Sequence, residues 1–281
     1  MPSGSGTQDG TSGASASGAV VGLKPAERLL HALCQALKIG NAAPERAAFA
    51  FIAGIERADV GIASDAADIH WRLHELALAC DRAGEALLEY GRLEPGVTVL
   101  RLGLKIRVRL ASLVVTDALF REIVDAPIEV AANHFAIAGA FRRGGRPAEA
   151  LDGMLAGIAA YRREVEAGGD PYALDTLAAH VEDAGRIARD VPARDAMRAY
   201  FADSLTLRER AARLAPEDAD LARAFVEAAV WRAPDLGKAS APWLDRARRL
   251  LAEREAGSRP VPGTPRLRNL VDTAGAPYLS S

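Results

Sequence analysis

The sequence predicts an all-α protein built from stacked antiparallel helical hairpins, an α-solenoid, with a disordered tail at each end. Composition supports the helical class, because alanine, leucine, arginine and glutamate are all abundant and all favour helices. Aromatic residues make up only 5% of the 281 residues, and β-branched residues are few outside one stretch. These proportions argue against an all-β fold. The hairpin architecture follows from where the prolines lie.

Proline marks the positions where helices are expected to begin. Because proline lacks an N–H and has φ held near the helical value, it fits the first turn of a helix and disrupts its interior. Two series recur at nearly constant spacing: Pro127, Pro171 and Pro216 are 44 and 45 residues apart, and Pro147, Pro192 and Pro242 are 45 and 50 residues apart. The two series interleave, which indicates a helical repeat array.

The first 124 residues are expected to contain a tail and two hairpins. Residues 1–22 are rich in glycine and serine and predict a disordered tail. The region 23–124 is predicted to be helical, with one hairpin from 25–39 and 44–59 and a longer one from 65–92 and 96–124.

The segment 97–115 fits two structures. Apolar and basic residues alternate over 100–110, and a period of two is typical of a strand. In the same segment Arg101, Lys105 and Arg109 recur every four residues, as on one face of a helix. The helical pattern extends over more residues and suits its neighbours, so we expect a helix, with an amphipathic β segment as the alternative.

The region 125–255 is predicted to form three helix pairs, and the remainder to be a tail. The expected pairs are 127–143 with 147–166, 171–189 with 192–214, and 216–232 with 241–255. Asp170 is expected to cap the helix that follows it. Residues 256–281 hold four prolines and little apolar periodicity, so they predict an extended Pro-rich tail.

One of these pairs resembles a known repeat. Small, aromatic, turn, small, bulky and small residues follow one another at Ala138, Phe141, Gly145, Ala150, Met154 and Gly157. This spacing is similar to that of the tetratricopeptide repeat (TPR), and 196–218 looks like the second helix and exit of its longer bacterial form. The resemblance covers about 130 residues. It implies a right-handed stack whose first helices line a concave groove that binds a peptide.

Charge and cysteine content narrow the function classes. The formal net charge of −2 argues against a dedicated nucleic-acid binder, and no apolar run is long enough to cross a membrane. Cys34 and Cys80 each lie in an apolar stretch and are interpreted as buried hydrophobes of a reducing compartment, so we expect a cytoplasmic protein. No motif for a cofactor or for catalysis occurs.

Two histidines offer an alternative function. His70 and His74 are four residues apart, so both would project from one helical face beside Glu75. That spacing can hold a metal, yet no third ligand follows from the sequence, and we predict neither a metal site nor catalysis. A helical-bundle metal protein or enzyme centred on this pair is the alternative.

Arginines supply the predicted binding residues. Aligning the helix pairs places Arg142, Arg189 and Arg232 at equivalent positions on the first helices, with Arg143 and Arg186 nearby. Guanidinium groups on a concave face could hold the carboxylates of an acidic peptide or protein segment. The alternative is that these arginines are solvated or paired within the chain. A regulatory scaffold subunit that associates through 65–124 is a third possibility for function.

Overall fold

The computed structural model describes residues 69–113, 118–191, 194–256, 261 and 263–279. Its elements in chain order are α3 (Ile69–Glu89), α4 (Leu93–Ala111), α5 (Ala118–Ile123), α6 (Ala126–Arg143), α7 (Pro147–Gly168), α8 (Pro171–Arg189), α9 (Arg194–Leu214), α10 (Ala219–Leu236), the 3-10 helix η2 (Gly237–Ser240), α11 (Ala241–Ala256) and α12 (Thr264–Leu279). No strand occurs within these ranges, which confirms the all-α class. The predicted tail over 1–22, the hairpin from 25–39 and 44–59, and Cys34 lie outside the described residues.

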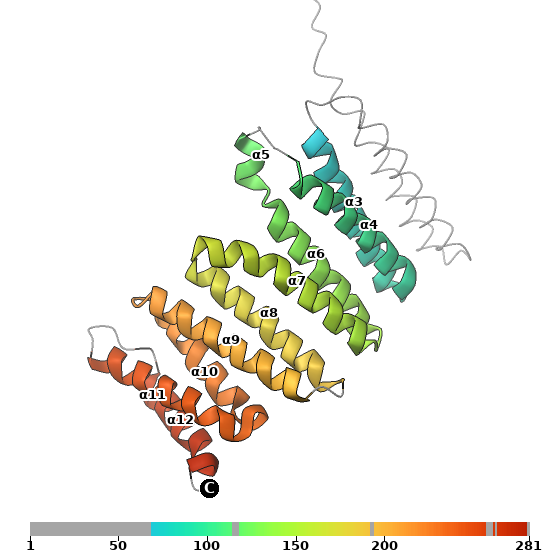
Figure 1. Ribbon diagram of the computed structural model, residues 1–281. Coiled ribbons are helices and arrows are strands. Elements are labelled where there is room, and N and C mark those ends of the chain that lie inside the picture. The colour runs from blue at the N-terminus through green and yellow to red at the C-terminus, as the bar shows by residue number, and fades with distance from the viewer. Residues whose placement is uncertain (1–68, 114–117, 192–193, 257–260, 262, 280–281) are drawn as a thin grey trace, which may run out of the picture.

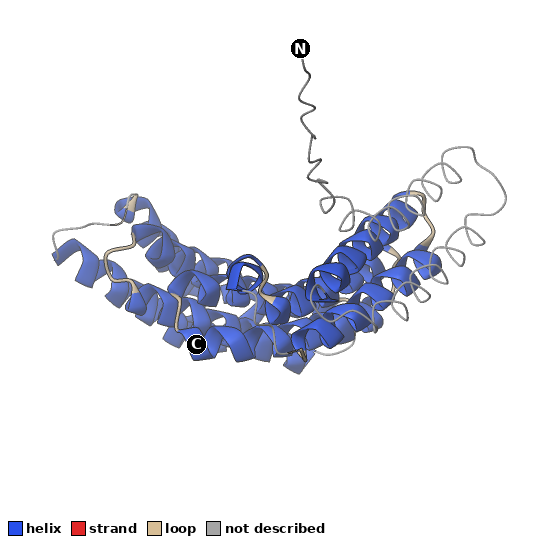
Figure 2. Cartoon of the chain, turned by 90° about the horizontal axis from the view of Figure 1, so that it is seen from above, coloured by secondary structure: helices blue, strands red, loops and turns tan. Residues whose placement is uncertain are grey.

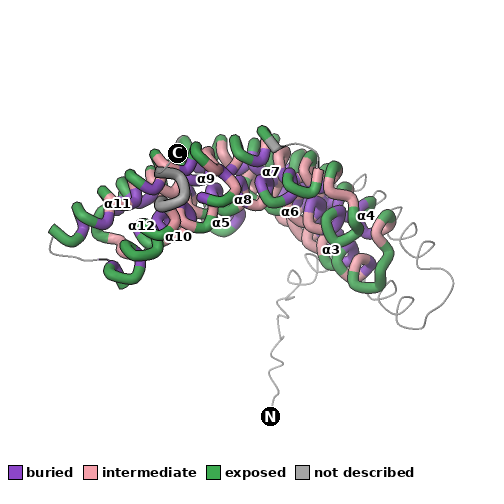
Figure 3. Tube along the Cα trace, turned by 90° about the horizontal axis from the view of Figure 1, so that it is seen from below, coloured by how far each residue is buried: buried purple, intermediate pink, exposed green. Residues whose placement is uncertain are grey.

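The helices form antiparallel hairpins that stack side by side (Figure 1). Helix α3 packs on α4, α6 on α7 and α8 on α9, and α4, α7 and α9 each pack on the first helix of the next hairpin. The stack is curved (Figure 2). Helices α3, α6, α8 and α10 lie along its inner face, whereas α4, α7, α9 and α11 lie along its outer face (Figure 3). This arrangement confirms the predicted α-solenoid.

Most of the predicted helix starts are confirmed. Pro147 and Pro171 are the first residues of α7 and α8, and the Asp170 carboxylate accepts hydrogen bonds from the N–H groups of Tyr172 (3.1 Å) and Ala173 (3.3 Å). These contacts satisfy donors that the first turn of a helix leaves free.

Helix α10 departs from the proline rule. It begins at Ala219, not at Pro216, because the Asp218 carboxylate caps it by accepting from the N–H groups of Asp220 (2.8 Å) and Leu221 (3.1 Å). Pro216 instead lies in the turn before the cap. Pro234 stands inside the helix, close to its C-terminal end.

The segment 97–115 is helical over most of its length, as expected. Helix α4 nevertheless begins at Leu93 and ends at Ala111, so the predicted helix 96–124 is wrong in its bounds. Pro95 fits the third helical position, where no N–H partner exists within the helix. At the other end, the Ser112 hydroxyl donates to the Arg109 carbonyl oxygen (2.6 Å), and the short helix α5 follows.

The predicted C-terminal tail over 256–281 is also wrong for Thr264–Leu279, which form α12. Pro265 is accommodated in the first turn of this helix. Leu267 and Val271, four residues apart, are both buried and belong to the core that α10 and α11 share with α12. A single pair of apolar residues at helical spacing is a weak signal in sequence, and tertiary packing stabilises the helix.

Glycines allow the paired helices to approach closely. Gly153 of α7 lies against Ala138 of α6. On α8, a Cβ added to Gly185 would lie 2.6 Å from Cε1 of Phe201, a ring of α9 that is fully buried. No side chain larger than hydrogen fits there without displacing the ring.

Substituting Gly185→Ala is therefore expected to lower the free energy of unfolding by about 1–2 kcal/mol, because overpacking outweighs the gain in helix propensity. Gly139→Ala is the matched control. A Cβ at this position of α6 would meet only the end of Arg143 at 3.5 Å, so this variant should be slightly stabilised. Urea denaturation of both variants measures the difference, and equal stabilisation of the two would contradict the close packing at Gly185.

Candidate functional site

The predicted arginines lie toward the C-terminal ends of three inner helices. Arg142 and Arg143 end α6, Arg186 and Arg189 lie in the last turn of α8, and Arg232 lies one turn before the end of α10. These helices belong to successive antiparallel hairpins, so they run in the same direction and their C-terminal ends lie along one edge of the inner face (Figure 1). The structure then divides the five arginines into two groups.

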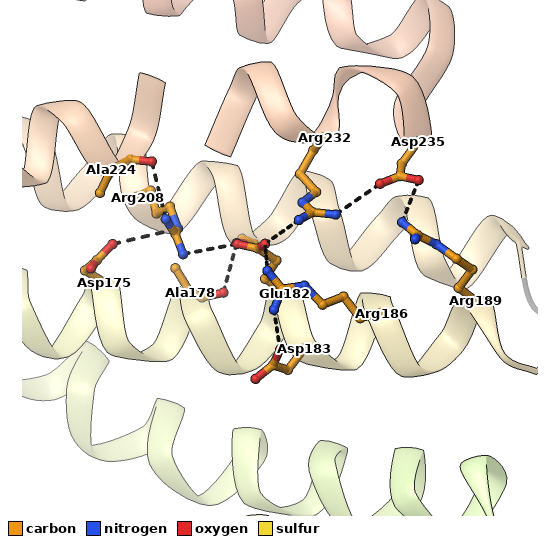
Figure 4. Close-up of polar contacts among 11 residues, drawn as sticks. Asp175, Ala178, Glu182, Asp183, Arg186, Arg189, Arg208, Ala224, Arg232 and Asp235 are labelled. Carbon is orange, nitrogen blue, oxygen red and sulfur yellow. Dashed lines mark hydrogen bonds and ion pairs between the residues drawn. The ribbon is translucent and has the colours of Figure 1, made fainter. Parts of the chain in front are cut away.

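Three of the five predicted arginines, namely Arg186, Arg189 and Arg232, belong to an ion-pair network centred on the carboxylate of Glu182. This carboxylate is only 4% exposed and lies between α8, α9 and α10 (Figure 4). Its Oε1 accepts from Nη2 of Arg186 at 2.7 Å and lies 3.0 Å from Nη2 of Arg232. Its Oε2 accepts from Nη2 of Arg208 at 3.1 Å. One buried carboxylate thus holds guanidinium groups from three helices.

Further carboxylates surround this centre. Asp235 accepts from Arg189 (2.7 Å) and Arg232 (3.1 Å) and so joins these two arginines, which are far apart in sequence. Asp183 pairs with Arg186, and Asp175 lies 3.8 Å from Nε of Arg208. Burial raises the pKa of Asp175 above its ordinary value. The four arginines therefore face four carboxylates, and the network carries little net charge.

Ion pairing, and not exposure, separates the two groups of arginines. The side chain of Arg232 is only 12% exposed, whereas those of Arg186 and Arg189 are 44% and 50% exposed at the edge of the network. Arg142 and Arg143 are exposed and form no ion pair with any described residue. Arg186, Arg189 and Arg232 are therefore paired within the chain, as the alternative interpretation predicted. Arg142 and Arg143 leave unpaired positive charge at the end of α6.

A second polar cluster lies between α3, α4 and α6. Arg107 of α4 is 3% exposed and donates two hydrogen bonds to Asp81 of α3, the one from Nη1 measuring 3.0 Å. Asn133 of α6 donates to the same carboxylate at 2.8 Å. Glu129 Oε2 lies 3.4 Å from Arg107 Nε and 3.3 Å from Nδ1 of His74. The cluster links the first hairpin to the second.

Burial and charge act on the two carboxylates of this cluster in different proportions. For Asp81 burial dominates and raises the pKa, although Arg107 and Asn133 oppose it. For Glu129 burial acts in the same direction, but His74 and Arg107 together outweigh it and hold the pKa below the ordinary value. The difference arises because Glu129 faces two basic side chains, whereas Asp81 faces one.

A cavity of about 220 Å³ adjoins this cluster. Its lining combines acidic, amide and small apolar residues: Asp81, Glu85, Leu100, Arg107, Glu129, Ala132, Asn133 and Ala136. This site was not predicted from the sequence. The one signal for it in the sequence is Arg107, a charged residue on the apolar side of α4, away from the stripe formed by Arg101, Lys105 and Arg109.

Both members of the histidine pair pack against the ring of Phe120. His70 is 8% exposed and packs edge-on against Phe120 at 4.7 Å between ring centroids, while His74 faces Glu129. Among the described residues no group of three or more His, Cys, Asp or Glu side chains could hold a metal ion. Cys80 is buried, as expected, and burial raises the pKa of its thiol to about 12.

Two further features of the described residues bear on function. Trp231 of α10, which packing arguments would place in the core, is instead 59% exposed, because the buried side of α10 is formed by its small and aliphatic residues and Phe225. In the described part of the chain no helix is both long and apolar enough to pass through a lipid bilayer.

Comparison with known proteins finds no matching family model and no matching curated protein. Among solved structures, the chain aligns with BtubC (BKLC) from P. vanneervenii at 16% identity and a TM-score of 0.40, covering 85% of this chain and 93% of that one. It aligns with a Podosopora anserina putative kinesin light chain with nearly identical TPR-like repeats at 14% identity and 0.34, covering 83% and 99%.

A third alignment is with the TPR2AB domain of yeast Sti1 in a complex with pHSP90, at 14% identity and a TM-score of 0.25, covering 89% of this chain and 98% of that one. The helix packing described above, in which each antiparallel hairpin stacks on the next, makes this chain an α-solenoid of helical hairpins.

Proposed function

We propose that this protein is a non-catalytic interaction module that binds a segment of a protein partner along the inner face of the stack. One helix from each hairpin contributes to that face. Its exposed positions include small residues, such as Ala132 on α6 and Thr176 and Ala179 on α8. Small side chains leave room for an extended chain to lie close to the helices, and the exposed Trp231 offers an aromatic anchor.

The observation that carries the proposal is the unpaired positive charge at the end of α6. Arg142 and Arg143 can hold a carboxylate of the partner without breaking any ion pair of the fold. Arg186 and Arg189 extend this edge and are half exposed, so they can exchange Asp183 and Asp235 for carboxylates of the ligand. Arg232 contributes by holding Asp235 in place. The expected ligand is an acidic peptide.

A charge-reversal experiment tests this proposal. A fluorescently labelled peptide of twelve residues rich in Asp and Glu is titrated with the protein, alongside a peptide in which Asn and Gln replace the acids. The wild-type chain is expected to bind the acidic peptide at least tenfold more tightly, and Arg142→Glu/Arg143→Glu should remove this preference. The reason is that two attractive contacts become repulsive ones.

The control reverses two exposed charges on the outer face. Lys105 of α4 and Arg163 of α7 are exposed and form no ion pair with the described residues, so Lys105→Glu/Arg163→Glu changes the net charge by the same amount. This variant should keep the preference for the acidic peptide. If both double variants lose binding equally, the attraction reflects net charge alone and the assignment of the inner face is wrong. Circular dichroism verifies that both variants remain helical.

A further inference from the structure

The cavity beside Arg107 is lined by residues of α3, α4 and α6. Its walls come from α3 and α6, which are both inner helices, and Leu100 and Arg107 of the outer helix α4 form its floor. Glu85 and Ala132 are exposed and lie at its rim. A segment bound along the inner face would therefore pass over the mouth of the cavity.

The packing of the first two hairpins explains why the cavity exists. Helix α6 packs on α4, whereas α3 reaches α6 mainly through polar contacts such as that between Asp81 and Asn133. Two of the α6 residues that line the gap, Ala132 and Ala136, have side chains too short to fill it. The volume is below the roughly 300–1,000 Å³ of sites for whole small molecules, so it suits a single side chain.

The charges on the cavity wall favour a cation. Three carboxylates, those of Asp81, Glu85 and Glu129, face one guanidinium, that of Arg107. Arg107 already contacts two of the three, and the Asn133 amide N–H is used by Asp81. The Oδ1 atom of Asn133, a residue only 3% exposed, has no hydrogen-bond partner among the described residues. The wall thus offers spare acceptors and excess negative charge.

We propose that this cavity receives the cationic side chain of a lysine or arginine from the bound segment, an inference that rests on the proposed function. An ammonium or guanidinium group would donate to Glu85 at the rim and to the acceptors deeper in the wall, and its alkyl stem would lie against Leu100 and Ala136. A carboxylate would be repelled, and an apolar group would leave the acceptors unpaired. Burial also raises the pKa of Asp81, because a charged carboxylate is unfavourable away from water. An incoming cation stabilises the charged form and so reduces this free-energy cost.

Helix α6 carries both residues of the cavity and the unpaired arginines at its C-terminal end, so its geometry gives the distance between the two sites. Ala132, Ala136, Gly139 and Arg143 follow one another at steps of three and four, so they share one face of α6. Seven to eleven residues of helix, at about 1.5 Å each, separate the cavity from Arg143 by roughly 10–16 Å. An extended peptide covers this distance in about three to five residues. The partner segment should therefore carry a basic residue three to five positions from an acidic one.

Small probes test the cavity directly in the full-length protein. The probes n-butylammonium, 1-butanol and butyrate share one alkyl chain, and NMR titration gives a dissociation constant for each. The cation is expected to bind at least fivefold more tightly than 1-butanol, and butyrate should not bind. Glu85→Gln should weaken the cation at least threefold because it removes one carboxylate, while Glu89→Gln, an exposed position one turn further along α3, should not.

A steric variant provides the second readout. Ala132→Leu fills the mouth and should abolish butylammonium binding, whereas Ala179→Leu, at an exposed position of α8, should leave it unchanged. The proposal is overturned if butylammonium binds no more tightly than 1-butanol, or if neither Glu85→Gln nor Ala132→Leu weakens it. Butylammonium binding that persists while the acidic peptide shows no preference would refute the proposed function but not the cation site.

Discussion

Replacing Glu182 with glutamine is expected to lower the free energy of unfolding by about 3–5 kcal/mol, the usual cost of breaking a buried ion pair by removing one partner. The Glu182 carboxylate is nearly inaccessible and contacts Arg186, Arg208 and Arg232 at 2.7–3.1 Å. A neutral amide has one acceptor oxygen where the carboxylate had two, and it adds N–H donors that point at cations. Arg208 and Arg232, each less than 15% exposed, would then each lose the carboxylate they share and keep only one, Asp175 or Asp235 respectively.

The neighbouring substitution Asp183→Asn is the control for this effect. Among the described residues Asp183 pairs with Arg186 alone, and both side chains are at least one third exposed, so its loss should cost less than about 1 kcal/mol. Guanidinium denaturation followed by circular dichroism measures both variants. Equal destabilisation of the two would show that Glu182 does not organise the network. Because the network joins α8, α9 and α10, Glu182→Gln should also change the curvature measured by small-angle X-ray scattering.

Arg107→Met is expected to destabilise the N-terminal hairpins by about 3 kcal/mol at pH 7, because it leaves Asp81 and Glu129 without their buried cation. The deficit should depend on pH. Burial already raises the pKa of Asp81, and loss of the guanidinium raises it further, while the pKa of the unfolded chain stays ordinary. A carboxyl group whose pKa is raised on folding destabilises the folded state at pH values above that pKa, where it must be charged. The loss of stability caused by Arg107→Met should therefore become smaller as the pH falls through the pKa of Asp81.

Two comparisons check the origin of this effect. Lys105→Met removes an exposed cation from the same helix and should have little influence on stability at either pH. Adding Asp81→Asn to Arg107→Met should recover part of the loss at pH 7, since a neutral amide then replaces the orphaned carboxylate. Denaturation curves at pH 7 and pH 4.5 measure both. A deficit that is the same at the two pH values would assign the effect to lost packing, not to charge.

The elements that the sequence predicted well are those that local chemistry determines. Pro147 and Pro171 begin helices because a proline ring suits the first turn wherever that turn occurs, and the Asp170 carboxylate caps a helix by reaching N–H groups two and three residues away. The prediction failed where tertiary contacts decide. Helix α12 forms because Leu267 and Val271 are buried against α10 and α11, and its own sequence contains little else that indicates a helix.

By itself the sequence determined that this protein is helical, where most helices begin, and that small residues let the hairpins stack, since each of these properties depends on residues a few positions apart. Only the tertiary structure decided what the charged residues do. Arg189 meets Asp235 across 46 residues of chain, and Asp81 meets Asn133 across 52. Long charged side chains acquire their partners only when the hairpins stack. For this reason the tertiary structure was needed to tell the paired arginines from the unpaired ones and to find the acidic cavity.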